Sequence, residues 1–310
     1  MARDQLLALI DLAEGRGLEI GALTKPIVTR SMGRIEYIDR ASTEDLRRWY
    51  ANQGHVDPAE LVEVDHVWGT QTLLDCVGGQ RVFNYLVASH VIEHVPDLFG
   101  WLGEIASVLS DGGIASFAVP DKRFTYDVRR RTSSESELVD AYVRKLRRPD
   151  PRQIFDHFIG FTNPDGTPSQ HDPRALMEDC RRVLAEGTYI DSHCWVFTPR
   201  TFVEALDLGS RLGLLPFEIG AIFPTTPPSN EFFVSLRRLP EALTTEQQRA
   251  AFVASRDRVD LPAEDTESEV EGLKQRLAAA ESELAALRGS TSWRITAPLR
   301  RAISLLRRSG

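Results

Sequence analysis

Short apolar runs alternate with amphipathic patterns along the first 120 residues of the chain. Apolar runs with the length of buried strands cover 16–22, 34–40, 61–67, 81–89 and 113–120. The segments 42–54 and 97–109 carry apolar residues three and four positions apart, which predicts helices. Strands that alternate with helices form right-handed units with parallel pairing. The pattern therefore predicts an α/β protein with a doubly wound, Rossmann-like and mostly parallel sheet.

The second half of the chain adds two more strands to this sheet. Residues 121–192 are charged and irregular. Helical patterns return at 134–147, at 173–186 and, after Thr198, at 198–214. The apolar segments 217–223 and 230–239 are joined by the short loop PTTPPS, which is too short for a parallel crossover. We therefore expect seven strands that end in an antiparallel hairpin.

The chain changes character after residue 240. Residues 241–264 are polar and acidic and predict a linker or an exposed helix. Over 265–289, apolar residues recur at alternating steps of three and four, as in a short coiled coil. This seam consists of Val270, Leu273, Leu277, Ala280, Leu284 and Leu287. It predicts a contact between copies of the chain, or with another protein, through 270–287.

A basic amphipathic tail, 290–310, ends the chain. Its apolar residues are Trp293, Ile295, Leu299, Ile303 and Leu306, and arginines flank them. A basic amphipathic helix with a tryptophan lies in the headgroup layer of a bilayer rather than across it. The segment 293–308 therefore predicts contact with an anionic membrane surface, although a helix that packs on a protein partner has the same pattern.

Charge and cysteine content narrow the class of partner and the compartment. The chain has a net charge of −8, and the six arginines from residue 288 onward leave a charge of −14 on the preceding residues. An acidic body of this kind argues against nucleic-acid binding. The three cysteines, Cys76, Cys180 and Cys194, form no CxxC pair and suggest neither disulfides nor a zinc site. Without a signal-peptide pattern, we expect a cytoplasmic protein, with the tail on the inner face of the cytoplasmic membrane.

Ionisable residues gather where the predicted strands end. Ligands bind outside the carboxyl ends of the strands in an open α/β sheet. Asp39 ends the second strand, 20 residues after Glu19, and an acid at that spacing is placed to accept hydrogen bonds from a ribose. The loop GALTKP has a single glycine, which disfavours a nicotinamide site, and no P-loop motif occurs.

Several of these motifs together resemble the class I S-adenosylmethionine-dependent methyltransferases. The motifs are LEIGA, YID, VEVDHV, SHVIEHVPD and the late hairpin, and the resemblance covers about residues 15–240 of a domain expected over 1–240. It implies S-adenosylmethionine as the cofactor and a substrate-side insertion at 121–192. The implied cofactor contacts are Glu19 and Gly21 beside the methionine moiety, Asp39 on the ribose, Asp65 on the adenine, and Ser89 with His90 on the sulfonium side.

The segment SHVIEHVPD holds three ionisable residues that we treat as candidate catalytic groups. In a helical turn, His90, Glu93 and His94 lie on one face. A histidine with a pKa near neutrality can take the proton of a hydroxyl. The same three residues can hold a divalent metal ion, with His157 or His193 as a further ligand, as in a similar cluster of some O-methyltransferases. The third alternative is structural, with Glu93 and His94 bracing the next helix.

Two other segments are candidates for the substrate side. His193 lies just before the last large helix, where similar methyltransferases often have a histidine close to the substrate mouth. The resemblance thus makes it a candidate catalytic residue, and the alternative is a core histidine beside Trp195. Asp121, Lys122 and Arg123 directly follow the fifth strand and are candidate substrate-binding residues, or ordinary surface charge.

The segments VPDKRFTYDVRRRTS and TSWRITAPLR are similar to proteins found with bacterial surface-polysaccharide assembly. The sequence therefore leads us to expect an O-methyltransferase for a glycan or glycolipid, with glycosyltransferases as partners. The alternatives are a glycosyltransferase with a nucleotide-sugar donor and a catalytically silent fold that serves as a membrane-associated scaffold.

Overall fold

The computed structural model describes residues 2–51, 56–69, 71–163 and 166–261, and those up to Leu261 form one compact unit. The predicted coiled coil (265–289) with its seam (270–287), and the basic tail (290–310) with its membrane segment (293–308), lie outside the described residues. Within the described part, no helix is long and apolar enough to cross a membrane.

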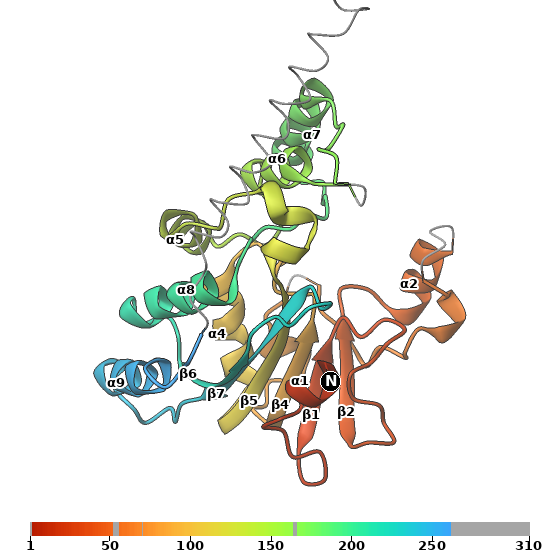
Figure 1. Cartoon of the computed structure of the whole chain (residues 1–310). Coiled ribbons are helices and arrows are strands. Elements are labelled where there is room, and N and C mark those ends of the chain that lie inside the picture. The colour runs from red at the N-terminus through yellow and green to blue at the C-terminus, as the bar shows by residue number, and fades with distance from the viewer. Residues whose placement is uncertain (1, 52–55, 70, 164–165, 262–310) are drawn as a thin grey trace, which may run out of the picture. The chain divides into compact units, whose positions relative to one another are not determined.

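Seven strands form one sheet, as the sequence predicts (Figure 1). Their order is β3-β2-β1-β4-β5-β7-β6, and every neighbouring pair is parallel except the two that involve β7. The strands are β1 (Arg16–Ile20), β2 (Arg34–Asp39), β3 (His66–Val67), β4 (Phe83–Ser89), β5 (Leu109–Pro120), β6 (Phe217–Phe223) and β7 (Glu231–Arg238). The chain starts in the middle of the sheet at β1, moves to one edge, and crosses over to β4. This crossover places the ends of β1 and β4 side by side, where ligands bind in doubly wound sheets.

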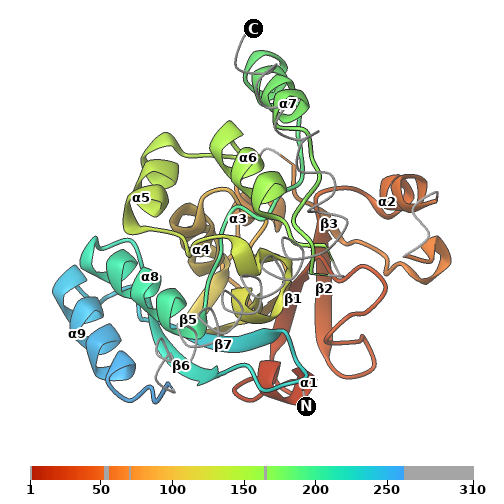
Figure 2. The same cartoon turned by 45° about the horizontal axis from the view of Figure 1, so that its top comes forward.

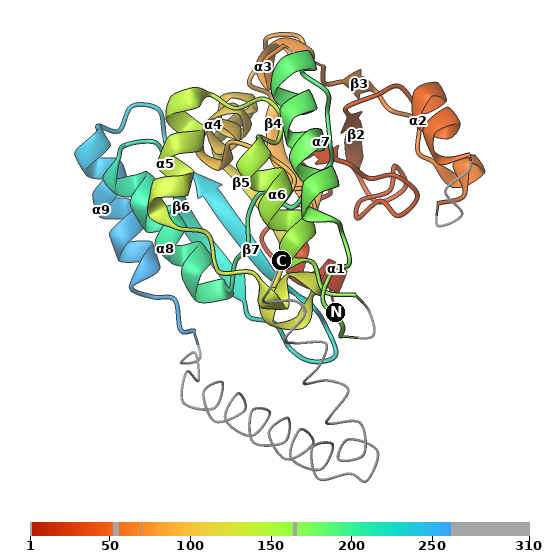
Figure 3. The ribbon, with the colours of Figure 1, turned by 90° about the horizontal axis from the view of Figure 1, so that it is seen from above.

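Helices cover both faces of the sheet. The α-helices are α1 (Ala2–Leu6), α2 (Thr43–Tyr50), α3 (Leu73–Cys76), α4 (Leu98–Val108), α5 (Glu135–Arg144), α6 (Pro151–Gly160), α7 (Pro173–Glu186), α8 (Pro199–Arg211) and α9 (Thr245–Arg256). Three short 3-10 helices complete the elements: η1 (Pro58–Glu60), η2 (Lys122–Phe124) and η3 (Tyr126–Arg129). Figure 3 shows α4, α8 and α9 on one side of the sheet, where their apolar side chains join the largest core cluster. The short α1 packs on the other side, against β5 and β7.

The inserted segment lies at the carboxyl ends of the parallel strands. Figure 2 shows α6 and α7 near this end of the sheet, and α2 beside β2 and β3. The helix α6 was missed in the sequence, although Asp150, Pro151 and Gln153 form an N-terminal capping box with proline in the first turn. Its apolar stripe packs on α7 around Ile154 and Leu176.

One predicted strand is much shorter than expected. The strand expected over 61–67 has only two residues, His66 and Val67, and the amide of Val62 donates to the carbonyl of Leu23 in the loop after β1. Residues 241–264, expected as a linker or an exposed helix, contain the helix α9, which packs on β6 and α8 and buries Phe252.

Gly17 in β1 has no space for a side chain. A Cβ atom at this position would lie 1.9 Å from the ring of Tyr85, which is buried in β4. We expect Gly17→Ala to lower the free energy of unfolding by at least about 1–3 kcal/mol, the usual cost of overpacking. The matched control is Gly103→Ala in α4, where a Cβ meets nothing within 4 Å and where alanine favours the helix by up to about 1 kcal/mol. Urea unfolding of both variants checks the prediction, and equal stabilities would contradict it.

Candidate active site

A cleft of about 480 Å³ opens at the carboxyl ends of the parallel strands. Its lining comes from the ends of β1 and β2, from the residues after β1, β2 and β3, from the loop between β4 and α4, and from α4 itself, with three residues of the inserted segment. These residues are Ile20, Gly21, Asp39, Arg40, Ala41, Trp68, Gly69, Val91, His94, Val95, Pro96, Asp97, Gly100, Trp101, Glu104, Leu146, Arg147 and Tyr189. The cleft therefore occupies the position that the strand order indicates for a ligand.

Gly21 and Asp39 line the cleft from adjacent strands. Gly21 has a φ of +70°, and a Cβ there would approach Val91 at 3.2 Å, so the glycine permits both the backbone turn and the close approach of the next loop. Burial raises the pKa of Asp39 above its ordinary value. The amide of Arg40 donates to the carboxylate at 2.7 Å and offsets this rise only in part. The structure thus places a half-buried carboxylate inside the cleft.

Glu19 lies behind the cleft and supports its wall. The carboxylate is 2 % exposed and accepts hydrogen bonds from the amides of Ile27 and Val28, at 2.7 and 3.0 Å. These bonds hold the loop that follows Gly21. Burial raises the pKa of Glu19 to about 7, although these two amides oppose the shift.

The raised pKa of Glu19 predicts a pH dependence of stability. Its ordinary value is 4.5, so between pH 4.5 and about 7 the folded protein binds a proton that the unfolded chain has lost. Stability therefore falls as pH rises through this window, and by pH 8 the loss is about 2–3 kcal/mol. Urea unfolding of the wild type and of Glu19→Gln at pH 5 and pH 8 tests this, because the difference between the two proteins cancels the other titrating groups. A difference that does not change with pH would contradict it.

Asp65 and Ser89, two further expected cofactor contacts, also lie outside the cleft lining. The carboxylate of Asp65 accepts from the amide of Tyr37 at 2.7 Å and pairs with Arg30 at 2.7 Å. Because β3 is so short, Asp65 precedes the strand rather than ending it. Ser89 ends β4 but is also absent from the lining. The structure therefore gives Asp65 a role in holding β2 and brings neither residue into the cleft.

Trp68 and Trp101 line the cleft, and the sequence analysis missed both. Trp68 follows β3 directly, whereas Trp101 comes from the first turns of α4. The indole Nε1 of Trp101 is buried and has no hydrogen-bond partner among the described residues. Trp68 could have been predicted as a lining residue, because it directly follows a predicted strand. Nothing in the sequence distinguishes Trp101 from an ordinary core residue of its helix.

His90 is held by two carboxylates and does not line the cleft. It adopts a left-handed φ of +53°, and its Nε2 lies 2.7 Å from Glu231 while its Nδ1 lies 3.4 Å from Glu93. Burial lowers the pKa of His90, but the two carboxylates raise it to about 10. An imidazolium near neutral pH is a poor proton acceptor, so this geometry disfavours His90 as the general base.

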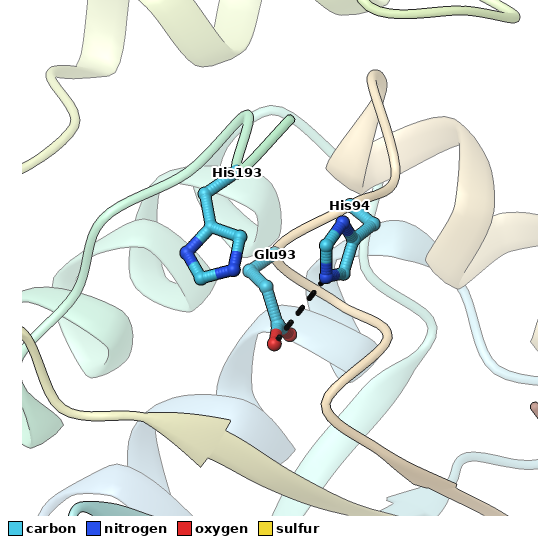
Figure 4. Close-up of side chains that lie close together, drawn as sticks. All are labelled: Glu93, His94 and His193. Carbon is cyan, nitrogen blue, oxygen red and sulfur yellow. Dashed lines mark ion pairs between the residues drawn. The ribbon is translucent and has the colours of Figure 1, made fainter. Parts of the chain in front are cut away.

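His94 and His193 meet around Glu93, and we call these three residues the histidine–glutamate cluster. One ligand-type atom from each residue lies within 4.8 Å of the other two. The rings of His94 and His193 meet edge to face at 4.8 Å (Figure 4). His94 also lines the cleft, so the cluster borders the ligand-binding space. The sequence offered His90, Glu93 and His94 as possible metal ligands. In the structure, His193 takes the place of His90 in this group.

Backbone pairing explains how His193 reaches this position from a distant part of the chain. The amide of Cys194 donates to the carbonyl of Glu93 at 2.6 Å, and the indole of Trp195 donates to the carbonyl of Val95 at 2.6 Å. The segment before α8 therefore lies along the loop between β4 and α4. His193 is mostly buried, and its ring contacts that of His94, which lines the cleft, so its catalytic role stays a prediction.

Two aspartates orient the histidines of the cluster. His193 Nδ1 lies 2.6 Å from Asp127, and His94 Nδ1 lies 3.0 Å from Asp191. Because a carboxylate only accepts, each Nδ1 carries the proton, which leaves Nε2 of both rings as the acceptor atom. Burial raises the pKa of Asp127, but His193 and Arg130 lower it to about 2. The sequence analysis missed both aspartates because no short motif connects them to the histidines.

The structure does not support Asp121, Lys122 and Arg123 as substrate contacts. Asp121 is fully buried, and its carboxylate pairs with Arg123 at 2.6 Å and accepts from Thr225 at 2.7 Å. Lys122 Nζ donates to the carbonyl of Val128 at 3.3 Å. None of the three residues lines the cleft. The amides of Asp121 and Lys122 donate to the carbonyls of Asn230 and Phe197 and fix the start of the inserted segment. The buried Asp121 is therefore structural, whereas substrate roles for Lys122 and Arg123 stay predictions.

Comparisons with known proteins found one matching family model and several similar solved structures. A family model described as "Methyltransferase domain" matches residues 2–208. An S-adenosylmethionine-dependent methyltransferase from Mesorhizobium loti shares 14% identity, with a TM-score of 0.38 over 76% of this chain and 98% of that one. Magnesium protoporphyrin IX methyltransferase from Synechocystis, solved with bound S-adenosylmethionine, shares 10% identity, with a TM-score of 0.33 over 76% of each chain.

A third similar structure, the CurJ carbon methyltransferase, shares 12% identity and a TM-score of 0.35 over 76% of this chain. The present chain spans about half of its length, 51%. No curated protein matches the chain. The family model covers more than half of the sequence, and the sheet has the predicted strand arrangement. The chain therefore belongs to the methyltransferase-domain family and has the class I S-adenosylmethionine-dependent methyltransferase fold.

Proposed function

We propose that this protein transfers the methyl group of S-adenosylmethionine to a hydroxyl of a glycan or lipid-linked saccharide. The observation that carries the proposal is that Asp39 and His94 line one cleft at the switch in strand order. The carboxylate of Asp39 can accept hydrogen bonds from a ribose, and the imidazole of His94 can accept the proton of a hydroxyl. The family match supports the reaction class.

The residues of the cleft fit S-adenosylmethionine. Asp39 would accept hydrogen bonds from the ribose hydroxyls, and Gly21 would leave the backbone open to the methionine part. Trp68 would offer an aromatic face to the adenine, and Trp101 has a buried N–H with no partner among the described residues. When bound, this cofactor supplies an electrophilic methyl group on a sulfonium. The chain itself supplies position and orientation, which are the main requirements of such a transfer.

The histidine–glutamate cluster provides a place for the hydroxyl proton. Asp191 fixes the ring of His94 so that Nε2 faces Glu93. In the neutral ring, Nε2 of His94 can take a proton from an acceptor hydroxyl in the cleft, and Glu93 and Asp191 stabilise the imidazolium that results.

The class of acceptor rests on the sequence resemblance to proteins of surface-polysaccharide assembly. We propose that the tail holds the enzyme at an anionic membrane surface, where lipid-linked saccharides are found, and that glycosyltransferases are its partners. The tail segment 293–308 supports this through its flanking arginines and its tryptophan.

Calorimetric titration with S-adenosylhomocysteine tests the proposal, with a uridine diphosphate sugar as the comparison ligand. We expect S-adenosylhomocysteine to bind with one site per chain and the nucleotide sugar not to bind. The reverse result would favour a glycosyltransferase, and absence of binding for both would favour a scaffold without catalytic activity.

A further inference from the structure

We propose that Glu93, His94 and His193 bind a divalent transition-metal ion. Binding of the metal ion does not depend on the proposed methyltransferase function, but the role of the ion in catalysis rests on that function. The proposal replaces His90, whose ring nitrogens face Glu231 and Glu93, with His193 from the segment before α8.

The three side chains converge on one point. Figure 4 shows one ring nitrogen of His193 turned toward Glu93 and His94, and the other turned away. The nitrogen turned away is Nδ1, which pairs with Asp127, so Nε2 faces the cluster. His94 Nε2 lies 3.9 Å from Glu93 Oε1. The ligand atoms lie within 4.8 Å of one another, a separation that small side-chain movements can close around an ion.

A buried carboxylate oxygen in the cluster lacks a hydrogen-bond partner. Glu93 is 2 % exposed, and its Oε2 forms no hydrogen bond within the described part of the chain. A buried carboxylate oxygen without a partner is costly. A bound cation would satisfy it.

Both histidines have the surroundings that metal-binding histidines usually have. Such a histidine typically donates its second ring N–H to a carboxylate, which fixes the ring and makes the free nitrogen more basic. His193 has Asp127 in this position at 2.6 Å, and His94 has Asp191 at 3.0 Å. Two independent carboxylate–histidine pairs thus present their Nε2 atoms to the same carboxylate.

The ligand set indicates which metal ions would bind. Two imidazoles and one carboxylate favour ions from manganese to zinc, whereas magnesium and calcium prefer oxygen ligands. Three protein ligands also leave coordination positions open, as in catalytic sites. The ion would therefore have room for a further ligand from the cleft that His94 lines.

An ion at this point would activate the acceptor. A hydroxyl that binds to it becomes more acidic because the ion stabilises the developing negative charge on oxygen. The oxygen–carbon bond then forms as the carbon–sulfur bond of the methyl donor breaks, and the hydroxyl proton is released to solvent. In this form of the mechanism, His94 binds the metal ion and does not accept the hydroxyl proton.

The test begins with full-length protein freed of metal by a chelator and dialysed. Co²⁺ and Zn²⁺ are titrated by calorimetry, and the visible absorption of Co²⁺ reports its coordination. We expect one ion per chain, and binding at least about 100-fold weaker in His94→Ala and in His193→Ala. Asp127→Asn and Asp191→Asn should weaken binding by about 10- to 100-fold. Circular dichroism shows whether each variant is folded.

The matched control is His171→Ala, which removes an exposed histidine that bonds to Ser169. It should leave the affinity unchanged. The proposal is wrong if the wild type binds no ion, or if the ligand variants are folded and bind as tightly as the control. S-adenosylhomocysteine is titrated into the same samples. Binding of this ligand without metal binding refutes the metal site alone, whereas metal binding without this ligand refutes the proposed function alone.

Discussion

Asp39→Ala is expected to bind S-adenosylhomocysteine at least about tenfold more weakly than the wild type while it remains folded. The change removes a half-buried carboxylate at the end of β2 that would accept two hydrogen bonds from the ribose. Two such charge-assisted bonds contribute about 2–4 kcal/mol, of which each 1.4 kcal/mol is a factor of ten in affinity. Calorimetry at one salt concentration measures the change directly.

Asp65→Asn is the matched control for this experiment. Asp65 is another acid that the family resemblance places on the cofactor, but the structure pairs it with Arg30 outside the cleft lining. We expect its affinity to stay within about twofold of the wild type, with some loss of stability from the weakened pair. If Asp65→Asn loses affinity and Asp39→Ala does not, the cofactor lies elsewhere than in this cleft.

His94→Ala is expected to reduce turnover by about 10²- to 10⁴-fold, the usual contribution of a group that handles a proton. The measurement is transfer of a labelled methyl group from S-adenosylmethionine to a panel of free and lipid-linked saccharides. His193→Ala should show a similar loss, because His193 completes the cluster around Glu93. Affinity for S-adenosylhomocysteine should change much less than turnover, since neither residue is placed on the ribose.

His90→Asn separates structure from catalysis in this assay. Asparagine tolerates the left-handed conformation at this position, but it removes the bonds to Glu231 and Glu93. We expect a larger effect of this variant on thermal stability than on turnover, and the opposite for His94→Ala. If His94→Ala and His193→Ala both keep full turnover, the cluster has no part in catalysis.

The fold and the location of the cleft could be predicted from local patterns. The alternation of apolar runs and amphipathic segments reports which face of each element is buried, and this is sufficient for the parallel sheet and its final hairpin. Asp39 and Gly21 were found for the same reason, because a residue that ends a parallel strand lies at the edge where ligands bind. The length of β3 could not be predicted in this way, because the amide of Val62, inside the expected strand, donates to the carbonyl of Leu23 in a distant loop.

The composition of the histidine–glutamate cluster is a property of the tertiary structure. In the sequence, His90 and His94 are equivalent candidates, four residues apart on one short segment. The fold separates them, because Glu231 on β7 binds His90 while Asp191 orients His94 in the cleft. It also removes Asp121 from the site by burying its carboxylate beside Arg123.

The sequence by itself thus determined the α/β class and the position of Asp39 at the end of the second strand, because these depend on interactions between near neighbours in the chain. Only the tertiary structure decided that His193 and Asp127 join Glu93 and His94. Their approach depends on backbone hydrogen bonds of Cys194 with Glu93, and on the indole of Trp195 with Val95, about a hundred residues away in the chain. Local periodicity carries no information on such a pairing, because it reports which residues are buried and not which distant segment covers them.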